Sequence, residues 1–74
     1  MSTRKEDVLS MQLMLVPMLA KEWKMTLPEL SDTFARYDIP EYIDTCYESY
    51  NSTGNQGILD DLTEFVKLQG GQVG

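Results

Sequence analysis

The chain has 74 residues, with six basic and twelve acidic side chains, no histidine and one cysteine. A chain of this length forms at most one domain and buries only about 60 to 65% of the surface that its unfolded form exposes. The missing histidine excludes Ser/His and Cys/His catalytic pairs and the usual histidine metal sites, and a single cysteine excludes an internal disulfide.

The charges are unevenly distributed along the chain. Residues 1–24 carry four basic and three acidic side chains, whereas residues 25–74 carry two basic and nine acidic ones. An acidic surface repels phosphate backbones and anionic lipid, and it attracts basic partners over about one Debye length of ~8–10 Å. We therefore expect no nucleic acid and no membrane among the partners. The simpler interpretation is a solvated surface that keeps the protein soluble.

The first long segment is almost wholly apolar. From Val8 to Ala20 only Ser10 and Gln12 are polar, but this run of 13 residues is shorter than the ~18–20 that cross a bilayer. A cleaved signal peptide is not expected either, because the charge-balanced residues 1–7 lack a basic leader. The lone cysteine is compatible with a reducing compartment, so we expect the protein in the cytoplasm.

The same segment has the start signal of a helix. Thr3 and Glu6 have the spacing of a capping box, which predicts a helix over about residues 4–24. Pro17 removes one helical N–H and presses against the carbonyl of Leu13. We therefore expect a kink near Pro17 in this helix, in preference to a second helix that begins there.

Three later segments have apolar residues at helical spacing with carboxylates between them. They predict helices over 27–37, 39–51 and 55–69. No segment alternates polar and apolar residues with a period of two, so no strand is predicted. The expected fold is all-α: a compact four-helix cluster without a sheet, in a single helical domain over 1–74.

The ends of these helices have recognisable signals. Thr26 and Glu29 form a second capping box, and Asp38 is expected to cap the following helix in the same way. Gly54 is expected to end a helix in the left-handed conformation. Residues 70–74, which begin with two glycines, are expected to form a flexible tail.

Few side chains suggest chemistry. Cys46 lies on the apolar face of its predicted helix, where a thiol is usually an inert hydrophobic group. Asp60, Asp61 and Glu64 could approach a cation, but no loop of alternating oxygen ligands precedes them. We therefore expect no catalytic residue, no cofactor and no metal, and we interpret the protein as not an enzyme.

A helix-turn-helix DNA-binding regulator is the alternative function. Two short helices joined by a tight turn over residues 26–50 suit that motif. The would-be recognition helix, however, presents Glu41, Asp44 and Glu48 and no basic residue. It would meet phosphates with the wrong charge, and phosphate contacts supply most of the non-specific affinity for DNA.

The leading hypothesis is a protein interaction module. A first helix that is apolar around most of its circumference needs cover on several sides, from its own core or from a partner. Methionine adapts to varied surfaces, and tyrosine offers contact area together with a hydroxyl for the rim of an interface. The candidate partner-binding residues are Met11, Met14, Met18, Tyr42, Tyr47 and Tyr50. We expect the partner to be another protein, basic in character, or a second copy in a homo-oligomer.

The apolar and turn residues also have a recognisable overall spacing. This pattern comprises Leu30, Phe34, Tyr37, Ile39, Tyr42, Ile43, Tyr47, Thr53, Gly54, Ile58, Asp60, Leu62, Phe65 and Val66. It resembles a family of short, uncharacterised bacterial proteins known only as a domain of unknown function, over about residues 5–68. Members are sometimes encoded beside putative toxins of the ADP-ribosyltransferase type, so the resemblance implies an accessory or antitoxin-like role. The family brings no catalytic residues with it.

Overall fold

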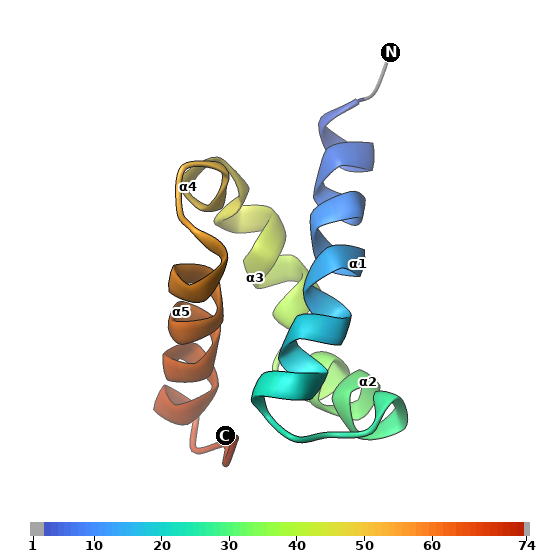
Figure 1. Ribbon diagram of the computed structural model, residues 1–74, viewed down its shortest axis with the longest axis vertical. Helices are drawn as coiled ribbons and strands as arrows, with labels where there is room; N and C mark the ends of the chain where they lie inside the picture. The colour runs from blue at the N-terminus through green and yellow to red at the C-terminus, as the bar shows by residue number, and fades with distance from the viewer. Residues whose placement is uncertain (1–2, 74) are drawn as a thin grey trace.

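The computed structural model describes residues 3–73, and over this range the regular structure is entirely helical. The helices are α1 (Arg4–Glu22), α2 (Leu27–Arg36), α3 (Ile39–Thr45), α4 (Tyr47–Asn51) and α5 (Asn55–Leu68) (Figure 1). The all-α prediction is confirmed. None of these helices combines the length and the apolar composition that a membrane span requires.

α1 runs without a break through Pro17. The predicted capping box opens it: the Glu6 amide donates to Thr3 Oγ1 at 3.2 Å, and the Thr3 amide donates to the Glu6 carboxylate at 3.3 Å. The helix ends at Glu22, slightly earlier than expected, and Lys24 then takes a left-handed conformation with φ 53°. No second helix begins at Pro17, and the kink stays a prediction.

The predicted helix over 39–51 is in fact two helices, so the expected count of four is wrong for the described chain. Cys46 has φ −95° and ψ 8°, outside the α-helical region, and it separates α3 from α4. Figure 1 shows α4 turning away from the axis of α3 at this point. The apolar pattern continues across the break, because Ile43 and Tyr50 on its two sides are both buried.

Two predicted helix caps are also wrong. Asp38 lies in the left-handed region, with φ 52° and ψ 41°, and its side chain makes no cap hydrogen bond. A side-chain cap needs extended backbone at that position, whereas the short α2–α3 connection turns sharply. Gly54 is extended, with φ −66° and ψ 158°, and it stands at the start of α5. The capping box of Thr26 and Glu29 is confirmed.

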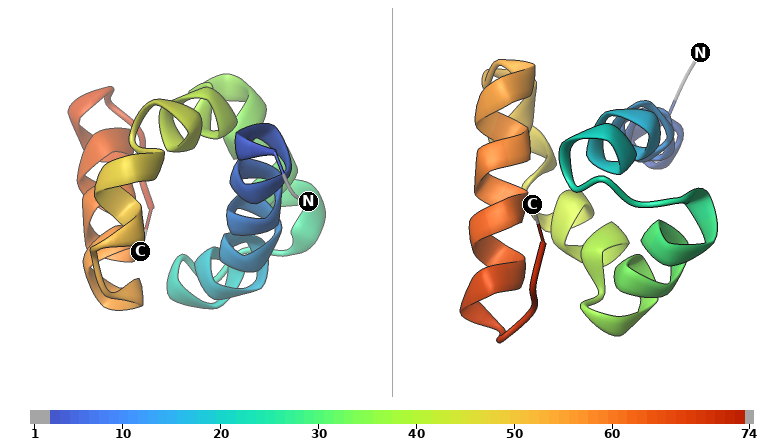
Figure 2. Two further views of the ribbon diagram at one scale, coloured as in Figure 1. Left: turned by 90° about the horizontal axis from the view of Figure 1, so that it is seen from above. Right: turned by 60° about the horizontal axis from the view of Figure 1, so that its bottom comes forward.

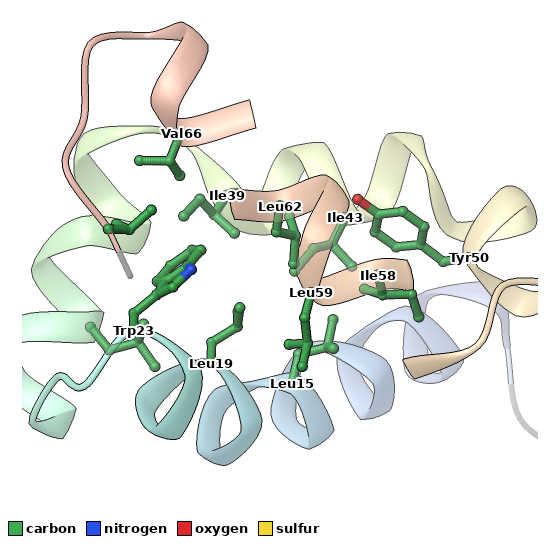
Figure 3. Close-up of a cluster of buried hydrophobic side chains, with 12 residues drawn as sticks. Leu15, Leu19, Trp23, Ile39, Ile43, Tyr50, Ile58, Leu59, Leu62 and Val66 are labelled. Atoms are coloured by element: carbon green, nitrogen blue, oxygen red, sulfur yellow. The ribbon is translucent and has the colours of Figure 1, made fainter. Parts of the chain in front are cut away.

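The core lies between α1, α3 and α5, whose arrangement around it is visible from above in Figure 2. Figure 3 shows the side chains of α1 and α5 pointing toward one another across this core. Its fully buried members include Leu15, Leu19, Ile39, Ile43, Ile58, Leu62 and Val66. Trp23, just after α1, is also buried, and its indole N–H donates to Thr63 Oγ1 of α5 at 2.8 Å.

Residues 70–73, part of the expected flexible tail, turn back along α5. Gly70 has φ 86°, a conformation that glycine adopts without strain. The Gly71 amide then donates to the Val66 carbonyl at 2.9 Å, and Val73 is buried in the core cluster. Gly74 lies outside the described residues. Val73 thus packs this segment against the core, and the flexibility expected for residues 70–74 in solution stays a prediction.

Candidate interaction surface

The outer side of α1 presents large apolar side chains that the core does not use. Leu9 and Leu13 are 54% and 63% exposed, and Met14 is 43% exposed. Pro17 is exposed on the same side, and Leu27 at the start of α2 is 62% exposed. We call these five residues the outer apolar face. The four members on α1 lie away from Val8, Leu15 and Leu19, the buried residues of that helix, and Leu27 begins the next helix.

An apolar groove lies beside Leu27, between α1 and α2. Its volume is about 490 Å³, and it shares Leu27 with the outer apolar face. The groove is lined by Val16, Leu27, Leu30, Ser31, Phe34, Ala35 and Pro40. Sites for small molecules usually add several placed polar groups that orient the ligand, and only Ser31 has a polar side chain here. The groove therefore suits the apolar side chains of a protein partner better than a polar metabolite.

Two of the candidate tyrosines meet at one carboxylate. The hydroxyls of Tyr42 and Tyr50 donate to Oδ2 of Asp61 at 2.9 and 2.6 Å. The Tyr42 ring stacks on Phe65 with 3.8 Å between ring centroids. Tyr50 is only 4% exposed and lies at the edge of the core (Figure 3). These contacts join α3 and α4 to α5, so both rings already have partners within the fold.

Burial and the Asp61 carboxylate keep these two hydroxyls protonated. Burial, followed by the hydrogen bond to Asp61, raises the pKa of both Tyr42 and Tyr50 well above the ordinary tyrosine value. A phenol with a raised pKa remains a hydrogen-bond donor near neutral pH and does not supply a nucleophilic phenolate. The arrangement is therefore suited to holding helices together.

Tyr47 and the start of α1 belong to a second, charged contact. Arg4 donates from Nη1 to Asp44 Oδ1 at 2.6 Å and from Nε to Glu48 Oε1 at 3.0 Å. Its guanidinium carbon also stands 5.4 Å from the centre of the Tyr47 ring. The hydrogen bond from Arg4 lowers the pKa of Glu48. Two carboxylates that were expected to attract a basic partner thus already bind an arginine of the same chain.

The three candidate methionines differ in exposure. Met11 and Met18 are half-buried and pack against the core cluster, whereas Met14 belongs to the outer apolar face. Of the six candidate residues, the structure therefore brings Tyr42 and Tyr50 together, and it places Met14 on the exposed side of α1. Leu9, Leu13 and Leu27 were not among the candidate partner-binding residues. The signal for Leu9 and Leu13 was the apolar character of α1 around most of its circumference, whereas Leu27 belongs to the apolar pattern of α2.

The carboxylates of α5 have separate neighbours. Asp60 accepts a hydrogen bond from the Gln56 amide at 3.0 Å, while Asp61 accepts from the two tyrosines. Within residues 3–73, no three side chains of the metal-binding types come together. The thiol of Cys46 is half-buried at the junction of α3 and α4.

Comparison with known proteins identifies one family. The family described as "Protein of unknown function (DUF3791)" matches residues 10–69, which include most of α1 and all of α2 to α5. No curated protein and no solved structure matches the chain. The match covers most of the chain and agrees with the resemblance to a domain of unknown function. The chain therefore belongs to the DUF3791 family of proteins of unknown function.

Proposed function

We propose that this chain is a non-enzymatic protein interaction module that binds through the outer apolar face and the adjoining groove. The observation that carries the proposal is the exposure of Leu9, Leu13 and Leu27, each more than half open, together with the apolar groove beside Leu27. Covering the exposed halves of three leucines contributes roughly 3 kcal/mol. Contiguous apolar patches on small proteins often mark sites of protein contact.

The neighbouring polar groups support binding over chemistry. The hydroxyls of Tyr42 and Tyr50 are hydrogen-bonded to Asp61. Arg4 forms ion pairs with Asp44 and Glu48. The groove has one polar side chain, Ser31, and no titratable one. A serine hydroxyl needs a neighbouring base to act as a nucleophile, and the groove holds Ser31 without such a group.

In a narrower form of this proposal, the protein is an accessory or antitoxin-like partner in the cytoplasm of a bacterium. This form is supported by the resemblance described above and by the acidic character of residues 25–74, which favours a basic partner. It predicts a reading frame for a toxin directly beside the gene for this chain. A gene neighbourhood without such a frame would contradict the narrower form and leave the binding surface untouched.

A pair of matched variants tests the binding surface. Leu13→Asp places a charge in the outer apolar face, and Leu68→Asp makes the same change at a residue that is 80% exposed at the end of α5. Both positions are exposed, so neither change opens the core, and circular dichroism checks that both variants fold. We expect the wild-type protein and Leu68→Asp to retain the same protein from a host lysate and Leu13→Asp to lose it. Equal retention by both variants would refute the proposed surface.

A further inference from the structure

Two charged residues of α1 lie at nearly equal distances along the helix on either side of Leu13. Leu13 stands in the middle of α1, with Glu6 seven residues before it and Lys21 eight residues after it. At 1.5 Å per residue, the two charges lie about 10 to 12 Å from Leu13 along the helix axis. At about 100° per residue, Glu6 is rotated by about 20° and Lys21 by about 80° from Leu13, in the same sense.

The apolar residues have the same symmetry. Leu9 comes four residues before Leu13, and Pro17 comes four residues after it. All three are exposed. The exposed apolar centre therefore has Glu6 toward one end of the helix and Lys21 toward the other, while Lys5, beside Glu6, is rotated by about 80° to the opposite side. Lys21 makes no ion pair with any residue in the described range 3–73.

We propose that a second copy of this chain covers the outer apolar face, with the two α1 helices antiparallel about a two-fold axis at Leu13. The inference rests on the proposed function and names the partner for the same surface. A two-fold axis perpendicular to the helices brings Glu6 of each copy to the level of Lys21 of the other, on the same side of the contact. Leu13 meets its own copy, and Leu9 lies at the level of Pro17 of the second copy.

The charges select this direction. In a parallel pair, the two copies of Glu6 would lie close together, and the two copies of Lys21 would lie on opposite sides of the contact without an acidic partner at their level. In the antiparallel pair both contacts join opposite charges. With Glu6 toward one end and Lys21 toward the other, the face is complementary to itself when it is reversed.

The length of α1 limits the area that the contact can bury. A specific interface at the lower end of the common range buries about 600 Å² on each partner, which is roughly an eighth of the 4906 Å² surface of this chain. The 19 residues of α1 form a rod about 28 Å long, and Leu27 with the groove widens the contact on one side. We therefore expect a dimer that dissociates in the micromolar range.

Sedimentation equilibrium over a wide range of concentrations tests for the dimer. The mass of the wild-type protein is expected to rise from 8.5 kDa toward twice that value. Leu13→Asp brings two carboxylates together at the two-fold axis, and we expect it to raise the dissociation constant at least about 100-fold. Leu68→Asp is expected to dimerise as the wild type does. A wild-type protein that stays at the monomer mass throughout would overturn the inference.

Charge exchange tests the antiparallel direction. Glu6→Lys alone and Lys21→Glu alone each replace two attractive contacts with two repulsive ones, and each is expected to raise the dissociation constant roughly 10-fold. An equimolar mixture of the two variants restores opposite charges at both contacts, so a heterodimer should form with the affinity of the wild type. The double variant in one chain should recover in the same way. Single variants that dimerise as well as the wild type would overturn the antiparallel arrangement.

Two control variants separate charge complementarity from helix stability. Glu29→Lys removes the equivalent glutamate of the other capping box, and Lys67→Glu reverses the equivalent lysine in the last turn of α5. Neither residue belongs to the outer apolar face, so both should leave the dissociation constant unchanged.

Different results would contradict the dimer and the proposed function. If the wild-type protein is a monomer and binds another protein in a way that depends on Leu13, the dimer is contradicted and the proposed function is supported. If Leu13→Asp binds the other protein as well as the wild type does, the proposed function is contradicted.

Discussion

Asp61 connects α5 to α3 and α4, and its replacement by alanine is the most direct test of how the helices are held together. The change removes the acceptor of Tyr50, at 2.6 Å, and that of Tyr42, at 2.9 Å. A hydrogen bond to a charged group contributes about 1.5–3 kcal/mol. Because Asp61 is exposed and both bonds end on one oxygen, we expect the pair to contribute about 2 kcal/mol. For a domain of this length, that loss lowers Tm by roughly 10 °C.

Urea denaturation monitored by the fluorescence of Trp23 measures this loss. Asp60→Ala is the matched control, since it makes the same change one residue earlier and removes only the contact with Gln56. We expect it to change the unfolding free energy by less than about 0.5 kcal/mol. A double-mutant cycle of Asp61→Ala with Tyr50→Phe should give a coupling of about 1 kcal/mol. If Asp61→Ala costs no more than Asp60→Ala, the carboxylate does not hold the helices together.

The same variant has a distinct pH dependence. The pKa values of Tyr42 and Tyr50 are raised in the folded protein, first by burial and then by Asp61. A raised pKa contributes stability that is fully present below the unfolded value of about 10 and is lost as the pH rises above it. The wild-type protein should therefore lose stability steeply above pH ~10. Asp61→Ala should lose it more gradually, so the two stability curves should converge at alkaline pH. Parallel curves would contradict this assignment.

Two further substitutions test the packing of the last helix and the segment that follows it. In Gly71→Ala, the new methyl group would meet Val66 and would lie 2.8 Å from the Tyr37 hydroxyl, so we expect a loss of about 1–3 kcal/mol in thermal denaturation. Gly54→Ala, with no atom within 4 Å, is the control, and equal losses would show that residues 70–73 do not pack as described. Thr63→Val removes the acceptor of the Trp23 indole, and we expect a loss of about 1–2 kcal/mol with a shift in tryptophan emission. Thr45→Val, whose hydroxyl donates only to the Glu41 carbonyl of its own helix, should leave the emission unchanged.

The features that the sequence predicted well are those whose partners are close along the chain. Both capping boxes form because Thr3 and Thr26 each have a glutamate three residues later, and this contact needs no other helix. The break at Cys46 has no such local signal. Neither proline nor glycine marks it, and the apolar spacing continues from α3 into α4. The end of a helix inside a continuous apolar pattern depends on the packing around it, which the spacing does not contain.

The candidate surface was only partly predictable for a related reason. Leu13 and Leu15 are the same residue type two positions apart, yet Leu13 is exposed and Leu15 is fully buried. Composition and spacing indicate that α1 is apolar around most of its circumference, but the positions of α2, α3 and α5 decide which sides are covered. The partner of Arg4 at Asp44, 40 residues away, depends on the same long-range packing.

The packing of α1 on α5 also constrains how the protein is made. α5 provides Ile58, Leu62 and Val66, so the core remains open on a ribosome until nearly all of the described chain has emerged. During that interval both sides of the nascent first helix are apolar and uncovered, which favours aggregation or capture by a chaperone. Translation that stalls before α5 would release a fragment in which Leu15 is exposed to solvent. Quality-control proteases should degrade this fragment rapidly.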